Sequence, residues 1–268
     1  MPEELRSVEP LRTLLTHRPI GLFSDIDGTL SPIVANPGDA RISPRCQELL
    51  RALMAEGVVV ALITGRPLET ARRMTGLDGA VYAANHGLSL WIDGHDETSQ
   101  AVREYMAVAQ RIFEETSDIA ADGVFVEVSG PNLAFHYRQA RDERAAKDTI
   151  ISCIRASNAA ATYRMREGRK IIELRPPLDI DKGTAVTDLA GRLEIAALIC
   201  LGDDQTDMDM FMAAAQLRAN GLPAATIAVH SEEAAPQLLA SADYSLRGVA
   251  GVEVFLDQFL TALRREAP

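Results

Sequence analysis

Two aspartates that leave an apolar segment together are the first candidates for chemistry. Asp25 and Asp27 follow the apolar run at residues 20–23, and Gly28 comes directly after them. One carboxylate in such a pair can attack phosphorus as a nucleophile, and the other can give a proton to the leaving oxygen and later take one from water. Gly28 would permit a sharp turn and the close approach of a phosphate group. An acidic turn that caps a helix is the alternative interpretation of this segment alone.

Two further segments could bind a phosphate group. Thr64, Gly65 and Arg66 follow an apolar run, so a hydroxyl and backbone N–H groups can hold phosphate oxygens beside the helix that Pro67 opens. Lys182 stands at a predicted helix start, where positive charge opposes the helix dipole, so we interpret it as a cation that neutralises the phosphate and the nucleophile. Taken singly, the first segment is equally typical of a plain loop, and Lys182 of a solvated surface.

An acidic segment, residues 202–207, could hold a metal ion. Asp203, Asp204 and Asp207 are packed tightly after an apolar run, and such carboxylates repel one another unless a cation joins them. Hard oxygen ligands suit Mg²⁺. One of the aspartates could instead cap the helix that begins near Thr206, although three exceed what capping needs.

The elements that must position these side chains alternate between strand and helix. Continuous aliphatic runs flanked by glycine or polar residues predict buried parallel strands, and the intervening segments have helical periodicity. This alternation predicts an α/β fold with a doubly wound parallel sheet, in which ligands bind at the carboxyl ends of the strands. The predicted strands are residues 20–23, 58–63, 80–84, 196–201 and 225–229.

The middle of the chain has a different pattern. Two helical segments accompany pairs of adjacent short strands, including a hairpin signal around Glu167 and Gly168. We therefore expect an α+β domain at residues 94–177, inserted into a catalytic core formed by residues 1–93 and 178–268.

Composition restricts the class of protein. The chain has 268 residues, a net charge of −11 and three cysteines without a C-x-x-C pair. The acidic balance argues against nucleic acid or an anionic membrane as partner, and the cysteine spacing against a zinc site or a disulfide framework. The N-terminus lacks an apolar signal region, and no apolar run is long enough to cross a bilayer. We expect a soluble, cytoplasmic, monomeric protein.

In combination and order, the four polar segments resemble the haloacid dehalogenase (HAD) superfamily of phosphohydrolases. Within it, the chain is similar to the trehalose-6-phosphate phosphatase family. The finer resemblance is carried by residues 84–87 (ANHG), 133–138 (LAFHYR), 171–177 (IIELRPP) and 202–211 (GDDQTDMDMF).

The resemblance implies Mg²⁺-dependent hydrolysis of trehalose 6-phosphate through an aspartyl-phosphate intermediate. It makes Asp25 the nucleophile and Asp27 the general acid/base. The inserted domain would be a cap over the sugar. The implied binding residues are Thr64, Gly65, Arg66 and Lys182 for phosphate; Asn85, His86, Arg138 and Glu173 for substrate; and, for Mg²⁺, the Asp25 side chain, the Asp27 carbonyl and Asp203, with Asp204 or Asp207 in support.

Two departures from the family pattern concern the substrate. Ser129 stands where family members often carry a cap lysine, and Leu88 and Ser89 replace the usual Ala-Glu after His-Gly. Another sugar phosphate or a glycosyl phosphoglycerate therefore remains an alternative substrate. A phospho-aspartate receiver module is the alternative outside the enzymes. The second aspartate and the length of the chain argue against it.

Overall fold

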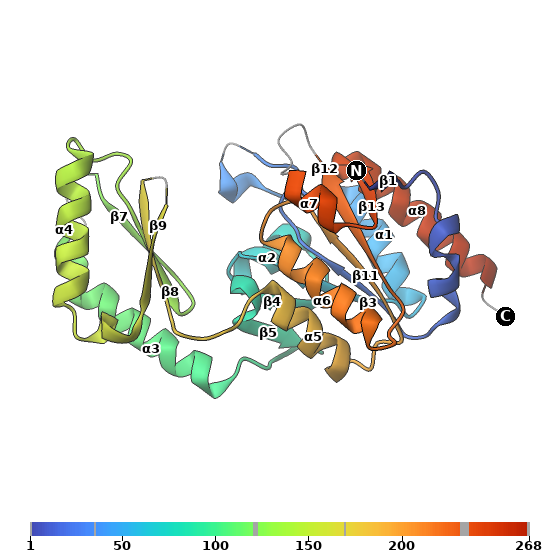
Figure 1. Ribbon diagram of the computed structural model, residues 1–268, viewed down its shortest axis with the longest axis horizontal. Coiled ribbons are helices and arrows are strands. Elements are labelled where there is room, and N and C mark those ends of the chain that lie inside the picture. The colour runs from blue at the N-terminus through green and yellow to red at the C-terminus, as the bar shows by residue number, and fades with distance from the viewer. Residues whose placement is uncertain (1, 35, 120–122, 169, 231–235, 267–268) are drawn as a thin grey trace. The chain divides into compact units, whose positions relative to one another are not determined.

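The computed structural model describes residues 2–34, 36–119, 123–168, 170–230 and 236–266. The chain divides into two compact units, the first formed by Met1–Glu97 with Ile180–Pro268 and the second by Thr98–Asp179 (Figure 1). This confirms the predicted fold class, an α/β core interrupted by an α+β insertion.

The first unit is built on one nine-stranded sheet. Its strand order is β1-β13-β12-β11-β2-β3-β4-β5-β6, and all neighbours are parallel except the pairs β4–β5 and β5–β6. The strands are β1 (Glu3–Glu4), β2 (Ile20–Ser24), β3 (Val59–Ile63), β4 (Val81–Ala84), β5 (Ser89–Ile92), β6 (His95–Asp96), β11 (Ala197–Gly202), β12 (Ala224–His230) and β13 (Tyr244–Arg247).

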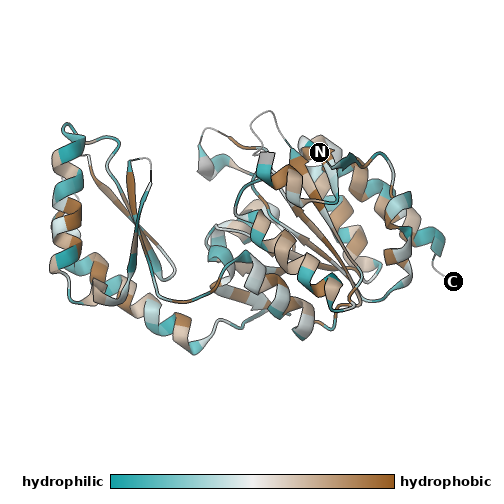
Figure 2. Ribbon diagram, in the orientation of Figure 1, coloured by the Kyte–Doolittle hydropathy of each residue, from teal (hydrophilic) through white to brown (hydrophobic). Residues whose placement is uncertain are grey.

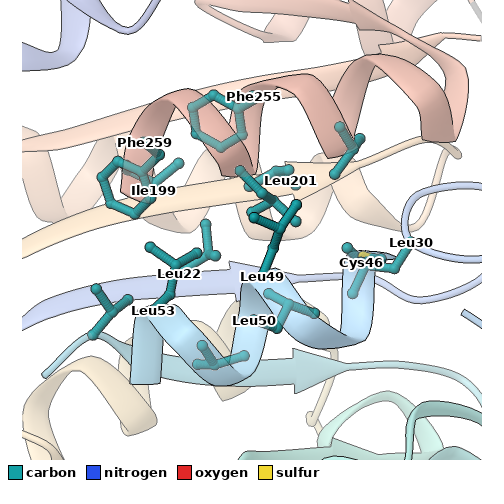
Figure 3. Close-up of a cluster of buried hydrophobic side chains, with 14 of the residues drawn as sticks. Leu22, Leu30, Cys46, Leu49, Leu50, Leu53, Ile199, Leu201, Phe255 and Phe259 are labelled. Carbon is teal, nitrogen blue, oxygen red and sulfur yellow. The ribbon is translucent and has the colours of Figure 1, made fainter. Parts of the chain in front are cut away.

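Helices cover both faces of this sheet, as the predicted crossovers require. One buried apolar cluster joins the sheet to helices η1, α1, α2 and α8 (Figure 3). Another joins the opposite face to α5, α6 and α7. The central strands are coloured hydrophobic in Figure 2, since both of their faces are covered. The helices are η1 (Glu9–Thr16), α1 (Pro44–Ala55), α2 (Leu68–Thr75), α5 (Lys182–Arg192), α6 (Asp207–Ala219), α7 (Pro236–Ser241) and α8 (Gly248–Glu266).

The second unit is a four-stranded antiparallel sheet with two long helices. The strand order is β7-β8-β10-β9, and burial alternates along β8 and β10 because one face packs on helices while the other stays open. The elements are α3 (Gln100–Glu115), β7 (Phe125–Ser129), β8 (Asn132–His136), α4 (Glu143–Ala156), β9 (Arg164–Gly168) and β10 (Ile171–Arg175). The predicted hairpin is therefore the β9–β10 pair.

The structure adds elements that periodicity did not predict. Strands β1, β5, β6 and β13 are two to four residues long, and they lie at or near the sheet edges. Such short segments carry too few alternating positions to stand out from loops. Among the described residues, no helix has both the length and the apolar composition to cross a membrane.

Candidate active site

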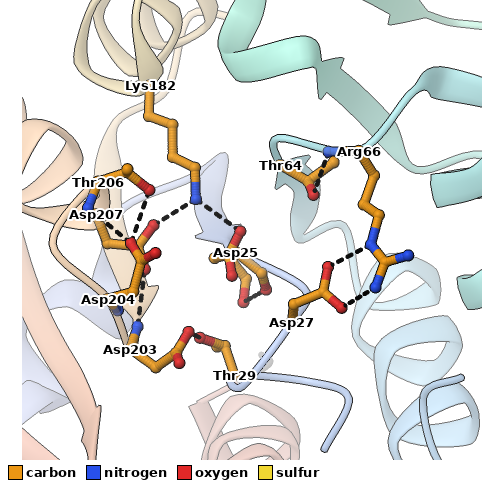
Figure 4. A network of polar contacts seen from close by, with 11 residues as sticks. Asp25, Asp27, Thr29, Thr64, Arg66, Lys182, Asp203, Asp204, Thr206 and Asp207 are labelled. Carbon is orange, nitrogen blue, oxygen red and sulfur yellow. Dashed lines mark hydrogen bonds and ion pairs between the residues drawn. The ribbon is translucent and has the colours of Figure 1, made fainter. Parts of the chain in front are cut away.

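Four of the polar segments predicted for the first unit's site follow strands at the carboxyl edge of the sheet. Asp25 follows β2, Thr64 follows β3, Asn85 follows β4 and Asp203 follows β11. Lys182 opens α5 and reaches the same place (Figure 4). Parallel pairing of β11, β2, β3 and β4 brings these ends together, so segments far apart in the chain converge.

A buried lysine links two carboxylates at the centre of the site. The Lys182 ammonium donates to Asp25 Oδ1 at 2.8 Å and to Asp207 Oδ1 at 2.7 Å. Asp25, Lys182 and Asp207 are all buried, with at most 5% of each residue exposed. The predicted surface alternative for Lys182 is therefore wrong.

The pKa values of this cluster follow from an excess of buried carboxylates. Burial raises the pKa of Asp25 well above its ordinary value, and the Lys182 ammonium only partly offsets this. Burial lowers the pKa of Lys182, but the charges of Asp25 and Asp207 outweigh burial and raise it. The ammonium is therefore charged, and one cation must serve several carboxylates. A divalent cation would relieve that imbalance.

Asp203 lies against the backbone of the loop after β2. Thr29 Oγ1 donates to Asp203 Oδ1 at 3.2 Å, a contact that sequence reasoning missed although Thr29 directly follows the Asp-x-Asp-Gly segment. Gly28 has a φ of +79°, and a Cβ there would overlap the Asp203 carboxylate. Burial first, and then the charges of Asp207 and Asp204, raise the pKa of Asp203 to about 7.

The oxygen atoms of three aspartates could hold a metal ion. Asp25, Asp203 and Asp207 each offer a carboxylate oxygen, and these oxygens lie within 4.8 Å of one another. Asp204, which we predicted as a ligand, is outside this group. Its Oδ1 instead accepts hydrogen bonds from the Thr206 amide at 2.6 Å and the Thr206 hydroxyl at 2.7 Å. The donor set is all carboxylate, which suits a hard divalent cation.

Asp207 also organises the loop that carries Asp203. Its Oδ2 accepts the backbone N–H groups of Asp203 at 2.8 Å and Asp204 at 3.0 Å. Gly202 is needed for this turn, because a Cβ there would overlap the Asp207 side chain. Asp207 therefore connects the acidic loop to Lys182.

Arg66, predicted to bind phosphate, is paired with Asp27. Arg66 Nε donates to Asp27 Oδ2 at 2.8 Å, and Arg66 Nη2 donates to Asp27 Oδ1 at 2.6 Å (Figure 4). The Arg66 amide also donates to Thr64 Oγ1 at 3.1 Å. Arg66 thus contacts Asp27 through its side chain and Thr64 through its backbone.

The loop after β4 packs on the Thr64 loop in an unusual backbone conformation. Asn85 and His86 have φ values of +51° and +59°, which non-glycine residues rarely adopt. The Asn85 amide donates to the Arg66 carbonyl at 3.0 Å, and the His86 amide donates to the Thr64 carbonyl at 2.8 Å. A Cβ on Gly65 would lie 2.7 Å from His86 Nε2, so the imidazole needs glycine at that position. Strain of this kind clusters at functional sites.

The remaining predicted substrate residues belong to the second unit. Glu173 lies on the open face of β10 and accepts a hydrogen bond from Arg175 at 2.9 Å. Arg138 lines a cavity of about 670 Å³ together with His136, Glu127 and Phe125. Glu173 is not among the residues that line this cavity.

The fold and the convergent segments define the class of protein, the HAD superfamily of phosphohydrolases. The solved structure of an Aspergillus fumigatus trehalose-6-phosphate phosphatase matches the chain with a TM-score of 0.67. The match covers 100% of both chains at 24% identity, and it shows the shared fold.

The sequence profile of the trehalose-phosphatase family matches residues 23–247, so the chain belongs to that family. It is 36% identical over 223 residues to an uncharacterized glycosyl hydrolase of Mycobacterium tuberculosis, across 79% of this chain and 16% of that protein. It is 32% identical over 245 residues to the trehalose-phosphate phosphatase of Mycobacterium leprae, across 87% and 56% respectively. The chain thus spans less than two thirds of the length of both relatives. Family membership contradicts the receiver-module alternative.

Proposed function

We propose that this protein is a Mg²⁺-dependent phosphatase that hydrolyses trehalose 6-phosphate to trehalose and phosphate. The observation that carries the proposal is the buried Asp25, held by Lys182 beside the carboxylates of Asp203 and Asp207. The family to which the chain belongs and the name of its Mycobacterium leprae relative support the choice of substrate. The net charge of −11 is consistent with a small substrate and not with nucleic acid.

The first half-reaction transfers the phosphoryl group to the protein. An Asp25 carboxylate oxygen forms a bond to phosphorus while the bond from phosphorus to the sugar oxygen breaks. Asp27 gives its proton to that sugar oxygen, so trehalose leaves as the neutral alcohol. Lys182 keeps Asp25 oriented, and Thr64 with the backbone of Gly65 would hold phosphoryl oxygens.

The second half-reaction restores Asp25. A water oxygen attacks phosphorus as Asp27 takes a proton from it, and the bond between phosphorus and Asp25 breaks to release phosphate. Mg²⁺ held by Asp25, Asp203 and the Asp27 carbonyl would supply positive charge near the phosphoryl oxygens. Asn85, His86, Arg138 and Glu173 are the proposed substrate contacts, with the second unit acting as a cap. We further propose a cytoplasmic monomer.

The test is phosphate release from a panel of phosphosugars with Mg²⁺, with and without EDTA. The panel contains trehalose 6-phosphate, glucose 6-phosphate, sucrose 6-phosphate and a glucosyl phosphoglycerate. A strong preference for trehalose 6-phosphate that EDTA abolishes is expected. Metal-dependent release from another phosphosugar would keep the mechanism and reject the substrate, and no release from any of them would reject the function.

A further inference from the structure

Both cations that converge on the site are already engaged by carboxylates. Lys182 serves Asp25 and Asp207, and Arg66 serves Asp27 with two hydrogen bonds. A phosphate monoester brings up to two negative charges into this site. Binding it therefore requires either added positive charge or an exchange of partners by one of these cations.

The two cations differ in how firmly they are held. The Lys182 side chain is 4% exposed and lies between two buried carboxylates. The side chains of Arg66 and Asp27 are 20% and 31% exposed, and Asp27 accepts two hydrogen bonds from the guanidinium. Separating a buried ion pair costs several kcal/mol, and the cost falls as the pair becomes more solvated. Arg66 is thus the cation that can change partner at the lower cost.

The backbone around Arg66 is fixed by hydrogen bonds, and its side chain is 20% exposed. The Arg66 amide donates to Thr64 Oγ1, and its carbonyl accepts from the Asn85 amide at 3.0 Å. A guanidinium binds carboxylate and phosphate oxygens with the same two-pronged geometry. A rotation of the Arg66 side chain alone can therefore move its guanidinium from Asp27 to a phosphoryl group beside Thr64.

We propose that Arg66 is a positioning residue that exchanges partners, holding Asp27 before substrate binds and transferring to the phosphoryl group on its arrival. Both Asp27 oxygens accept from Arg66 in this structure, so that carboxylate is engaged until the exchange occurs. Phosphate binding would then release Asp27, which can take up a proton from solvent and give it to the sugar oxygen as the bond from phosphorus to that oxygen breaks. This inference rests on the proposed phosphatase function.

The experiment is a double-mutant cycle on the binding of inorganic phosphate at saturating Mg²⁺, measured by calorimetry. The proteins are wild type, Asp27→Asn, Arg66→Gln and the double variant. If Asp27 competes with phosphate for Arg66, Asp27→Asn tightens phosphate binding about fivefold more when Arg66 is present than when it is Gln. The general effect of removing one negative charge is present in both backgrounds and cancels in the cycle.

Controls separate this exchange from a static ion pair. Arg73→Gln removes an exposed arginine from α2, the helix that follows the Arg66 loop, and should leave phosphate affinity unchanged. The Arg66 Nε–H resonance should shift when phosphate is added to the wild type. Equal effects of Asp27→Asn in the two backgrounds, or weaker phosphate binding by Asp27→Asn, would overturn the inference.

The same measurements distinguish failure of the inference from failure of the function. A cycle with no coupling in an enzyme that hydrolyses phosphosugars rejects the exchange alone. The expected coupling in a protein that releases phosphate from no phosphosugar supports the exchange and rejects the proposed reaction.

Discussion

At the scale of single residues, the site is a cluster in which carboxylates outnumber the buried cation. Asp25 and Asp207 share Lys182, and Asp203 lies beside them with a raised pKa. Among the described residues, Lys182 is thus shared by two carboxylates of the cluster. The same few side chains can therefore supply both the attacking oxygen and the ligands of a metal ion.

Replacing Asp25 by Asn removes the proposed nucleophile with little change in shape. We expect turnover to fall at least about a thousandfold, because the amide cannot form the covalent intermediate. Lys182 keeps its bond to Asp207, so the fold should survive. Phosphate release and circular dichroism are the measurements, and Asp188→Asn, at an exposed position of α5, is the control. Turnover near that of the wild type in Asp25→Asn would reject the nucleophile.

The raised pKa of Asp203 predicts that Mg²⁺ affinity depends on pH. Metal binding must displace a proton from Asp203 below a pH of about 7. Affinity should therefore rise at least about tenfold per pH unit up to that point, and the raised pKa of Asp25 adds to the dependence on pH. Calorimetric titrations at several pH values test this, and Asp203→Asn should remove most of the binding. An Mg²⁺ affinity that stays constant between about pH 5 and about pH 8, a range that contains the expected midpoint, would contradict the prediction.

The raised pKa of Asp203 also makes the stability of the metal-free protein depend on pH. A carboxyl whose pKa is raised from 3.8 to about 7 by folding binds a proton in the native state that the unfolded chain has lost. This contribution to stability is present at low pH and disappears as pH rises through about 7.

We expect the metal site to need glycine at position 28 for its lack of a side chain beside Asp203, in addition to its positive φ. Gly28→Ala places a Cβ into the Asp203 carboxylate, whereas Gly57 has a similar φ of +81° with no neighbour within 4 Å of its Cβ position. Both alanine variants should lose about 1 kcal/mol of unfolding free energy from backbone strain. We expect Gly28→Ala alone to raise the Mg²⁺ concentration for half-maximal phosphate release, by about tenfold. Equal metal dependence of the two variants would show that Asp203 tolerates the added methyl group.

At the scale of elements, the start of α5 fixes the position of Lys182. Asp181 caps this helix by accepting the Thr184 amide at 2.7 Å, while Thr184 Oγ1 accepts the Asp181 amide at 2.8 Å. This capping box holds the first turn, and Lys182 is its first residue. The proposed chemistry therefore depends on Asp181, which touches no reacting atom.

Asp181→Ala should lower both stability and rate. Loss of an N-cap costs about 1 kcal/mol, and a loosened first turn should lower kcat/KM about tenfold. Asp142→Ala is the matched control, because Asp142 caps α4 with two backbone bonds of 3.0 Å in the other unit. We expect this control to show a similar fall in Tm and no fall in kcat/KM. If both variants keep full kcat/KM, the cap does not position Lys182.

At the scale of the whole molecule, the two units have separate apolar cores. The second unit has its own buried cluster, which includes Phe135, Ile172 and Leu174. The cores of the first unit lie on the two faces of its large sheet. Each unit therefore has an apolar core of its own, as an element that unfolds cooperatively requires.

Phe135→Ala should unfold the second unit selectively. Phe135 is completely buried, and its truncation should cost about 3–5 kcal/mol. Hydrogen exchange should then speed up in β8 and β10 while β2 and β11 keep their protection. Phe125→Ala on the same sheet, at a side chain 63% exposed, should change little. A uniform loss of protection in both units would mean that they unfold together.

The sequence by itself determined which segments converge. Each polar segment follows an apolar run, and parallel strands place their carboxyl ends at one edge, so Asp25, Thr64 and Asp203 had to meet there. The same alternation predicted the central strands, and its interruption by pairs of adjacent short strands predicted the inserted α+β segment. These conclusions needed only the period of the hydrophobic pattern and the order of the elements.

Tertiary structure alone decided the partners within the site. That Arg66 engages Asp27 is visible only in the folded structure. That Asp207 and not Asp204 contacts Lys182 depends on the turn at Gly202 and the helix start at Asp207. Three aspartates within five residues are chemically alike in the sequence. In the folded structure they differ. Asp207 points inward, Asp204 accepts hydrogen bonds from Thr206, and Asp203 lies against Gly28.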